Sequence, residues 1–258
     1  MSLVAACCNT PAVEDAHWHN KGELVELSTE IAGQKRKTYV TGPKDSKRGI
    51  VAIYDIFAYH PTTFQFYDRI ALSHGGFQLS APEYFPEGGI PPECLGDGSK
   101  VMGWIGQHGD YHKNHILEVT LAAVEDLRKA GCTSFSLIGQ CWGVLMAAKV
   151  VSEEGTPFLS AGGPHPSFIS LDTTADVKTP LILLPSKDEA DLVPVIERNN
   201  TRGFAVESEH HRFDNMHHGW TGGRGDWKVP EQFKAALEAI DLFGAFYAKV
   251  AAANESKL

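Results

Sequence analysis

The chain has 258 residues, of which 43% are hydrophobic, and a formal net charge of −9. This length and composition can bury a large core, and we expect a single domain over residues 1–258 with residues 1–20 as an N-terminal arm. The acidic balance argues against nucleic acid and anionic membranes as partners, because both favour a basic face.

No apolar run approaches the length of a membrane span. The five cysteines are odd in number and two of them are adjacent, which is not the pattern of a disulfide framework. We therefore expect a cytoplasmic protein, as a monomer or homodimer, that acts on a small molecule.

Apolar, β-rich runs alternate with helix-like segments along the chain. We expect strands over 49–56, 76–81, 134–140, 180–185 and 205–209. We expect helices over 62–73, 115–130 and 230–253. Residues 82–103 are rich in proline and glycine and predict a loop. The alternation predicts an α/β fold, with a mostly parallel sheet covered by helices on both faces.

The third expected strand runs into a helix-like segment through Gly139, Cys141 and Gly143. This spacing is typical of a nucleophile elbow, a turn so sharp that small residues are needed two positions before and after the nucleophile. The Cys141 thiol would lie at a helix N-terminus, which favours the thiolate. The backbone N–H of Trp142 would supply one oxyanion-hole donor. The alternative is a buried structural cysteine within a chance glycine pattern.

A cysteine nucleophile needs a base, and the base needs an acidic residue that orients it. Asp188 follows the fourth expected strand and is our candidate acid because it lies nearest the strand's end, with Asp191 as the competing candidate. His218 follows the fifth expected strand and is the candidate base. Other histidines compete for this role: His165, His210, His211 and His217.

Together these residues resemble the dienelactone hydrolases, the cysteine-dependent branch of the α/β-hydrolase fold, over nearly the whole chain. The resemblance rests on the elbow at Cys141, on Asp188 after a strand, and on His-Gly-Trp at 218–220, which is similar to the family's His-Gly-Phe. The paired cysteines at 7–8 and His-Pro-Ser-Phe at 165–168 resemble eukaryotic members.

The resemblance implies hydrolysis of a small ester or lactone through a thioester on Cys141, with His218 as general base and Asp188 orienting its imidazole. It also implies that the N–H of Ile56 is the second oxyanion donor. Asp55 stands where bacterial members carry a glutamate that engages the thiol. Aspartate is one methylene shorter than glutamate, so its carboxylate reaches less far toward the Cys141 thiol. The alternative is that Asp55 caps its own loop.

Members of the family hold a substrate carboxylate with arginines, and Arg224 lies where one such arginine is expected. The alternative is a surface arginine paired with Asp226. Trp220 and aromatic residues beside Asp55 and Cys141 would line an apolar substrate pocket.

No nucleotide-binding glycine motif occurs, and we expect no cofactor. We also expect no metal, because His108 and His112 lack a His-Glu-x-x-His pattern and the adjacent Cys7 and Cys8 make a poor tetrahedral pair. Two other functions stay open: a catalytically silent relative that binds a ligand or partner, and a thiol-dependent redox protein.

Overall fold

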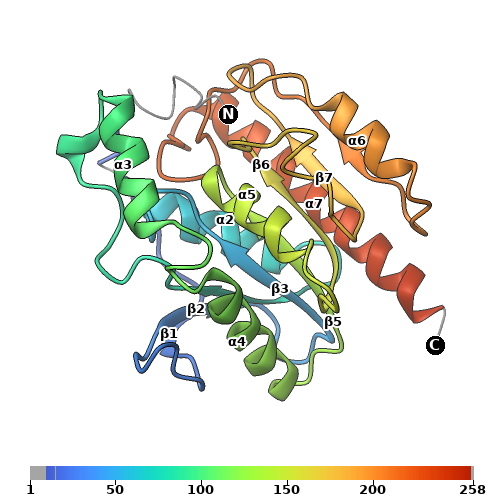
Figure 1. The fold of residues 1–258 in the computed structure, drawn as a ribbon. Helices are drawn as coiled ribbons and strands as arrows, with labels where there is room; N and C mark the ends of the chain where they lie inside the picture. Colours follow the sequence, from blue (N-terminus) through green and yellow to red (C-terminus); the bar gives the residue numbers. More distant parts are fainter. Residues whose placement is uncertain (1–9, 15, 257–258) are drawn as a thin grey trace.

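The computed structural model describes residues 10–14 and 16–256 (Figure 1). Within these residues an eight-stranded sheet has the order β1-β2-β4-β3-β5-β6-β7-β8. Its strands are β1 (Glu23–Glu26), β2 (Lys37–Thr41), β3 (Arg48–Ile53), β4 (Gln78–Pro82), β5 (Ser134–Gly139), β6 (Phe158–Pro164), β7 (Leu181–Leu184) and β8 (Glu209–His210). The pairs β1/β2 and β2/β4 are antiparallel, and the pairs from β4 to β8 are parallel.

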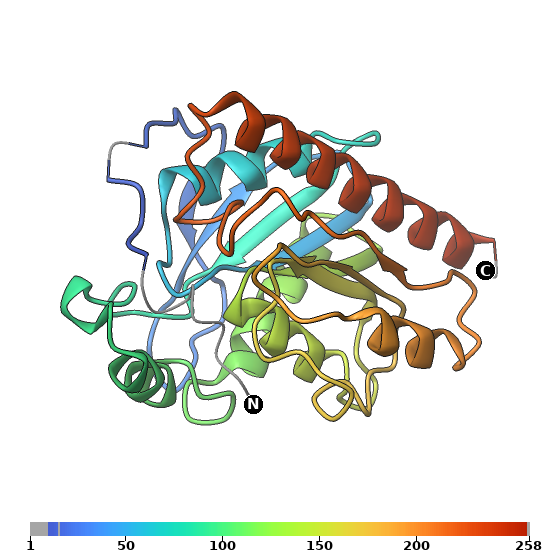
Figure 2. The ribbon, with the colours of Figure 1, turned by 90° about the horizontal axis from the view of Figure 1, so that it is seen from above.

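Helices cover both faces of the sheet. They are α2 (Pro61–Ala71), the 3₁₀ turn η1 (Pro92–Cys94), α3 (Gly98–His108), α4 (Ile116–Lys129), α5 (Trp142–Val150), α6 (Val193–Asn200) and α7 (Pro230–Glu255). Figure 2 shows α2 and α7 side by side on one face. Helices α4, α5 and α6 pack on the other face. None of these helices combines the length and apolarity needed to cross a membrane.

Strand β3 shows why the sheet is buried on both sides. Ile50 and Ala52 belong to the apolar core beneath α2 and α7, whereas Val51 and Ile53 belong to the core beneath α4 and α5. Successive side chains of a strand point to opposite faces, so the part of a strand that two helical layers cover, here residues 50–53, is apolar at every position. This continuous run is what made β3 recognisable in the sequence.

The predicted mostly parallel α/β sheet is confirmed, as are the helices α2, α4 and α7. Two local expectations were wrong. Residues 205–209 contribute only the first residue of the short β8, and the expected loop over 82–103 contains η1 and the beginning of α3. Helix α3 begins because the Asp97 side chain accepts hydrogen bonds from the N–H groups of Ser99 and Lys100, a capping signal within the glycine-rich stretch.

The N-terminal arm is anchored by one buried carboxylate, Asp68 of α2. It accepts hydrogen bonds from the Trp18 indole at 2.6 Å and the Lys21 backbone N–H at 2.9 Å. Tyr39 and Thr41 of β2 donate their hydroxyls to the same carboxylate, each at 2.7 Å. Asp68 therefore joins the arm, α2 and the antiparallel part of the sheet.

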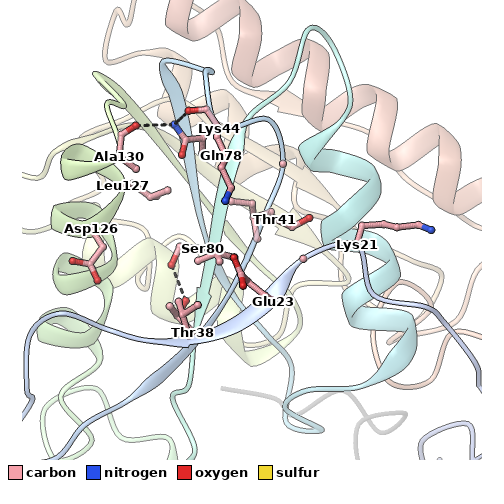
Figure 3. Close-up of a pocket in the computed structure, with 15 residues that line it drawn as sticks. Lys21, Glu23, Thr38, Thr41, Lys44, Gln78, Ser80, Asp126, Leu127 and Ala130 are labelled. Carbon is pink, nitrogen blue, oxygen red and sulfur yellow. Dashed lines mark hydrogen bonds between the residues drawn. The ribbon is translucent and has the colours of Figure 1, made fainter.

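A groove of about 730 Å³ lies over β2 and the first residues of β4, beside the end of α4 (Figure 3). Thr38 and Ser80 form a hydroxyl pair at 2.7 Å on its floor, and the Gln78 amide donates to the carbonyls of Lys44 and Ala130. Gln78 is the amino-terminal residue of β4. The groove is therefore remote from the carboxyl ends of the parallel strands, where α/β folds place their ligands.

Replacement of Asp68 by asparagine tests the anchor of the arm. Asp68→Asn should lower the free energy of unfolding by about 2 kcal/mol, because an amide matches fewer of the four donors and lacks the charge. Urea denaturation measures the change. Asp45→Asn, on the exposed turn after β2, is the control and should change stability by less than about 0.5 kcal/mol. Equal stability of both variants would contradict the role of Asp68.

Candidate functional site

The turn between β5 and α5 places Cys141 in a strained backbone conformation, with φ 55° and ψ −117°. A Cβ added at Gly139 would lie 2.2 Å from the carbonyl of Gly143. A Cβ added at Gly143 would lie 2.3 Å from the carbonyl oxygen of Ile53. Both glycines are therefore required by close backbone contacts, and the geometry is that of a nucleophile elbow.

Cys141, His218 and Glu189 form a continuous hydrogen-bonded chain. The Nε2 atom of His218 lies 3.1 Å from the Cys141 Sγ atom, and its Nδ1 atom lies 2.6 Å from Oε1 of Glu189. Cys141 is 3% exposed, and the side chains of His218 and Glu189 are buried as well. A thiol, an imidazole and a carboxylate in this order have the geometry of a catalytic triad.

The structure corrects the predicted acid of this triad. Asp188 accepts a hydrogen bond from the backbone N–H of His218 at 2.7 Å, while Glu189 contacts the imidazole. The Ser186 side chain determines this arrangement, because it accepts from the Asp188 N–H at 3.3 Å and donates to Glu189 at 3.1 Å. Asp191, the competing candidate, is exposed and accepts a hydrogen bond from the Val193 N–H at the start of α6.

Ser167 brings the loop after β6 to the thiol. Its hydroxyl oxygen lies 3.3 Å from the Cys141 Sγ atom, and its backbone N–H donates to the Cys141 carbonyl at 3.1 Å. His165 and Phe168, on either side, have left-handed backbone conformations that fold the loop back onto the elbow. The sequence showed this segment only as a family resemblance and gave no signal for a contact with the thiol.

His165 packs behind the candidate base. Its ring lies edge-on to that of His218, with centroids 5.1 Å apart, and its Nε2 atom lies 2.8 Å from the Thr221 hydroxyl. The Gln140 amide donates to the Thr221 carbonyl at 2.8 Å. Burial, together with the positive charges of His218 and Arg224, holds the pKa of His165 well below its usual value. His165 is therefore a neutral packing partner of His218 rather than a competing base.

The Asp55 carboxylate joins two loops of the site. One oxygen accepts a hydrogen bond from the Phe57 N–H and the other from the Gly223 N–H, both at 2.9 Å. Burial raises the pKa of Asp55, and the two backbone donors offset part of this rise. The arrangement supports the loop-capping interpretation of Asp55, with an added cross-link to the loop that follows His218.

Two predicted substrate-binding residues lie elsewhere than expected. Trp220 is 0% exposed and packs on Phe213 in the core beneath α7, with ring centroids 4.7 Å apart, so the prediction that it lines a substrate pocket is wrong. Arg224 is 3% exposed, which excludes the alternative of a surface arginine. Its Nε atom donates to the Thr10 carbonyl, and its guanidinium lies 4.8 Å from the centroid of the Phe57 ring.

The backbone N–H groups of Ile56 and Trp142 donate no hydrogen bond to any residue that the structure describes. They belong to the loop after β3 and to the first turn of α5, on either side of the elbow. The Trp142 side chain is part of the core, where its indole donates to the Gly109 carbonyl at 3.1 Å.

Over residues 10–14 and 16–256, no group of three or more histidine, cysteine and acidic side chains is placed to hold a metal ion. His108 stacks on Trp104, with ring centroids 5.0 Å apart. Cys7 and Cys8, the other metal-binding possibility, lie outside the described residues.

The lowered pKa of His165 predicts a pH-dependent stability. Below about pH 6.5 the unfolded chain binds a proton at this position that the folded chain does not, so stability decreases as the pH falls. His165→Asn should remove up to about 1.4 kcal/mol per pH unit from that slope between pH 6.5 and 5. Urea denaturation across this range measures it, with the exposed His19→Asn as control. Identical slopes for the wild type and His165→Asn would contradict the prediction.

Solved structures share this fold at low sequence identity. A dienelactone hydrolase-like promiscuous phosphotriesterase from metagenomic libraries superposes with a TM-score of 0.63 at 13% identity, covering 90% of this chain and 99% of that one. A dienelactone hydrolase from Anabaena variabilis superposes with a TM-score of 0.58 at 12% identity, covering 89% and 99%. These likenesses establish an α/β-hydrolase fold.

Sequence comparisons give the family. An uncharacterized AIM2 family protein of Schizosaccharomyces pombe is 26% identical over 262 residues, which cover 95% of this chain and 98% of the relative. A second uncharacterized AIM2 family protein of the same organism is 25% identical and covers 93% and 98%. The model of the dienelactone hydrolase family matches residues 37–248. This match spans most of the chain, which therefore belongs to the dienelactone hydrolase family.

Proposed function

We propose that this protein hydrolyses a small ester or lactone through a thioester formed on Cys141. The observation that carries the proposal is the unbroken chain from the Cys141 Sγ atom through His218 to Glu189, with contacts of 3.1 and 2.6 Å. Membership of the dienelactone hydrolase family supports the same reaction class.

The first half of the reaction is acylation. His218 takes the proton of the Cys141 thiol, and the thiolate attacks the substrate carbonyl carbon. The N–H groups of Ile56 and Trp142, which have no acceptor among the described residues, would stabilise the negative charge on the carbonyl oxygen. Collapse of this intermediate breaks the carbon–oxygen bond, and His218 returns its proton to the leaving oxygen.

Water completes the cycle. His218 removes a proton from the water molecule as the water attacks the thioester carbon. The bond to the Cys141 Sγ atom then breaks, the acid product leaves, and His218 returns the proton to the sulfur. Glu189 fixes the imidazole so that Nε2 faces the thiol, and it stabilises the positive charge that His218 carries twice in each cycle.

Two properties of the site point to small, activated substrates. Cys141 and His218 are nearly buried, which restricts access to the thiol. A thiolate expels a good leaving group such as an aryl oxide or enolate more readily than an amine. Enol lactones, the substrates that the family name indicates, combine small size with such a leaving group.

The activity test compares wild type and Cys141→Ala on an enol lactone and an activated aryl ester. We expect the variant to lose at least about a thousandfold in kcat/KM, because it lacks the nucleophile. Hydrolysis that is unchanged in Cys141→Ala would contradict the mechanism. Absence of hydrolysis in wild type would instead favour the ligand-binding alternative.

The assignment of the acid is tested by two neighbouring substitutions. Glu189→Gln should reduce kcat by about a thousandfold, since an amide neither fixes the required tautomer nor stabilises the imidazolium. Asp188→Asn should reduce kcat by less than about tenfold, because the Asp188 carboxylate bonds to the His218 backbone N–H and not to the imidazole. Steady-state kinetics, with circular dichroism to confirm folding, measures both. The opposite ranking would restore Asp188 as the acid.

A further inference from the structure

The sulfur of Cys141 contacts a hydroxyl as well as an imidazole. The Ser167 hydroxyl oxygen, on the loop after β6, lies 3.3 Å from the Cys141 Sγ atom, and Nε2 of His218 lies 3.1 Å from the same sulfur. The proposed mechanism assigns the proton transfer to His218 and gives Ser167 no part. A hydroxyl this close to a nucleophilic sulfur acts on the charge of that sulfur, in a direction that depends on which atom donates the hydrogen.

The backbone holds the Ser167 hydroxyl in this position. Ser167 is 0% exposed, and its N–H donates to the Cys141 carbonyl at 3.1 Å. Two residues earlier, the His165 N–H donates to the Leu184 carbonyl of β7 at 2.9 Å. The left-handed conformations of His165 and Phe168 turn the segment back toward the elbow. The hydroxyl is thus carried by a buried loop that is bonded to the elbow itself.

The proton positions within the triad make Ser167 the donor. Nδ1 of His218 faces the Glu189 carboxylate at 2.6 Å, so this nitrogen carries a proton. In the neutral imidazole, Nε2 is then an acceptor and receives the hydrogen of the Cys141 thiol. Once that proton has moved to Nε2, the sulfur carries none. In neither state does the sulfur have a hydrogen left for Ser167, so the hydroxyl donates to the sulfur in both.

A donor to the sulfur favours the thiolate over the thiol. Hydrogen bonds to an ionised acceptor are about twice as strong as those between neutral groups. Cys141 also precedes the first turn of α5, whose backbone N–H groups favour a thiolate. Burial of Cys141 acts in the opposite direction, because it penalises the charged form. The Ser167 hydroxyl therefore offsets part of the cost of a buried negative charge.

We propose that Ser167 is a further catalytic residue, whose hydroxyl stabilises the Cys141 thiolate and shifts the shared proton from Sγ toward Nε2 of His218. This shift breaks the S–H bond and makes an N–H bond, which converts thiol and imidazole into thiolate and imidazolium. The inference rests on the proposed function, because it concerns the nucleophile of that reaction. Its consequence is a larger fraction of thiolate at neutral and mildly acidic pH.

Other ionisable groups around the Cys141–His218 pair act on the same proton. They lie on the loops after β3, β6, β7 and β8 and are Asp55, His165, Asp188, Glu189, His217 and Arg224. The first turn of α5, which the structure describes in full, has no charged side chain. Removal of the Ser167 hydroxyl leaves all of these groups in place, so a change in the titration of Cys141 reports the hydroxyl.

Alkylation by iodoacetamide measures the Cys141 thiolate without requiring turnover. The sulfur bonds to the methylene carbon and iodide leaves, at a rate that follows the thiolate fraction. The reagent is uncharged, and peptide mass spectrometry separates Cys141 from the other four cysteines. The midpoint of the pH–rate profile belongs to the coupled Cys141–His218 pair.

We expect Ser167→Ala to raise this midpoint by at least about 0.5 pH units, which is about a threefold change in the ionisation equilibrium. Ser167→Gly also lacks the hydroxyl and should show the same rise, so the test survives if one of the two variants does not fold. A smaller shift, or a lower midpoint, would overturn the proposal.

Two control variants separate the hydroxyl from a general loss of packing. Ser160→Ala removes another buried hydroxyl of the same region, on β6, which pairs with Ser136 at 2.9 Å. Its midpoint should stay within about 0.2 pH units of the wild type, and a rise equal to that of Ser167→Ala would overturn the proposal. Ser167→Thr keeps a hydroxyl and should restore the wild-type midpoint. A midpoint equal to that of Ser167→Ala would overturn the assignment to the hydroxyl.

The pH dependence of ester hydrolysis connects the inference to turnover. With 4-nitrophenyl acetate, Ser167→Ala should lose at least about threefold in kcat/KM below the wild-type midpoint and less than about twofold above both midpoints. An equal loss at every pH would indicate a structural defect and overturn the proposal. If the wild type hydrolyses neither this ester nor an enol lactone, the proposed function fails, whereas the alkylation profile still decides the role of Ser167.

Discussion

The structure depends on the left-handed backbone at Cys141. This conformation turns the chain from β5 into α5 within two residues, and it is possible only because Gly139 and Gly143 allow backbone atoms to approach where a Cβ would clash. The turn projects the thiol from the carboxyl edge of the sheet, where the loops that follow β6, β7 and β8 converge on it. The strain at one residue thereby positions the whole triad.

Buried polar contacts then hold the histidine loop against this elbow. Asp55 fixes Gly223, while Gln140 and His165 both bond to Thr221. Each such bond contributes about 1 kcal/mol, but together they leave the loop few other conformations. These bonds position the backbone that carries His218, and the Glu189 carboxylate then fixes the imidazole with Nε2 toward the thiol.

The sequence was informative where chemistry is tied to short-range spacing. The glycines around Cys141 predicted the elbow, and the order of nucleophile, acid and base along the chain predicted which loops meet. The sequence did not predict features that depend on the direction of a side chain within a turn. Asp188 and Glu189 are adjacent acids, and only the Ser186 contacts decide which of them reaches the imidazole. Trp220 likewise follows His218 closely in sequence, yet its ring faces the opposite core.

The central claim is that Cys141 carries the acyl group during turnover. Acid quenching during hydrolysis of an activated aryl ester, followed by intact-protein and peptide mass spectrometry, observes this intermediate directly. The account predicts an added acyl mass on the peptide that contains Cys141, with protein blocked beforehand at Cys141 by iodoacetamide showing neither adduct nor turnover. An acyl group on another side chain, or undiminished turnover by the blocked protein, would contradict it.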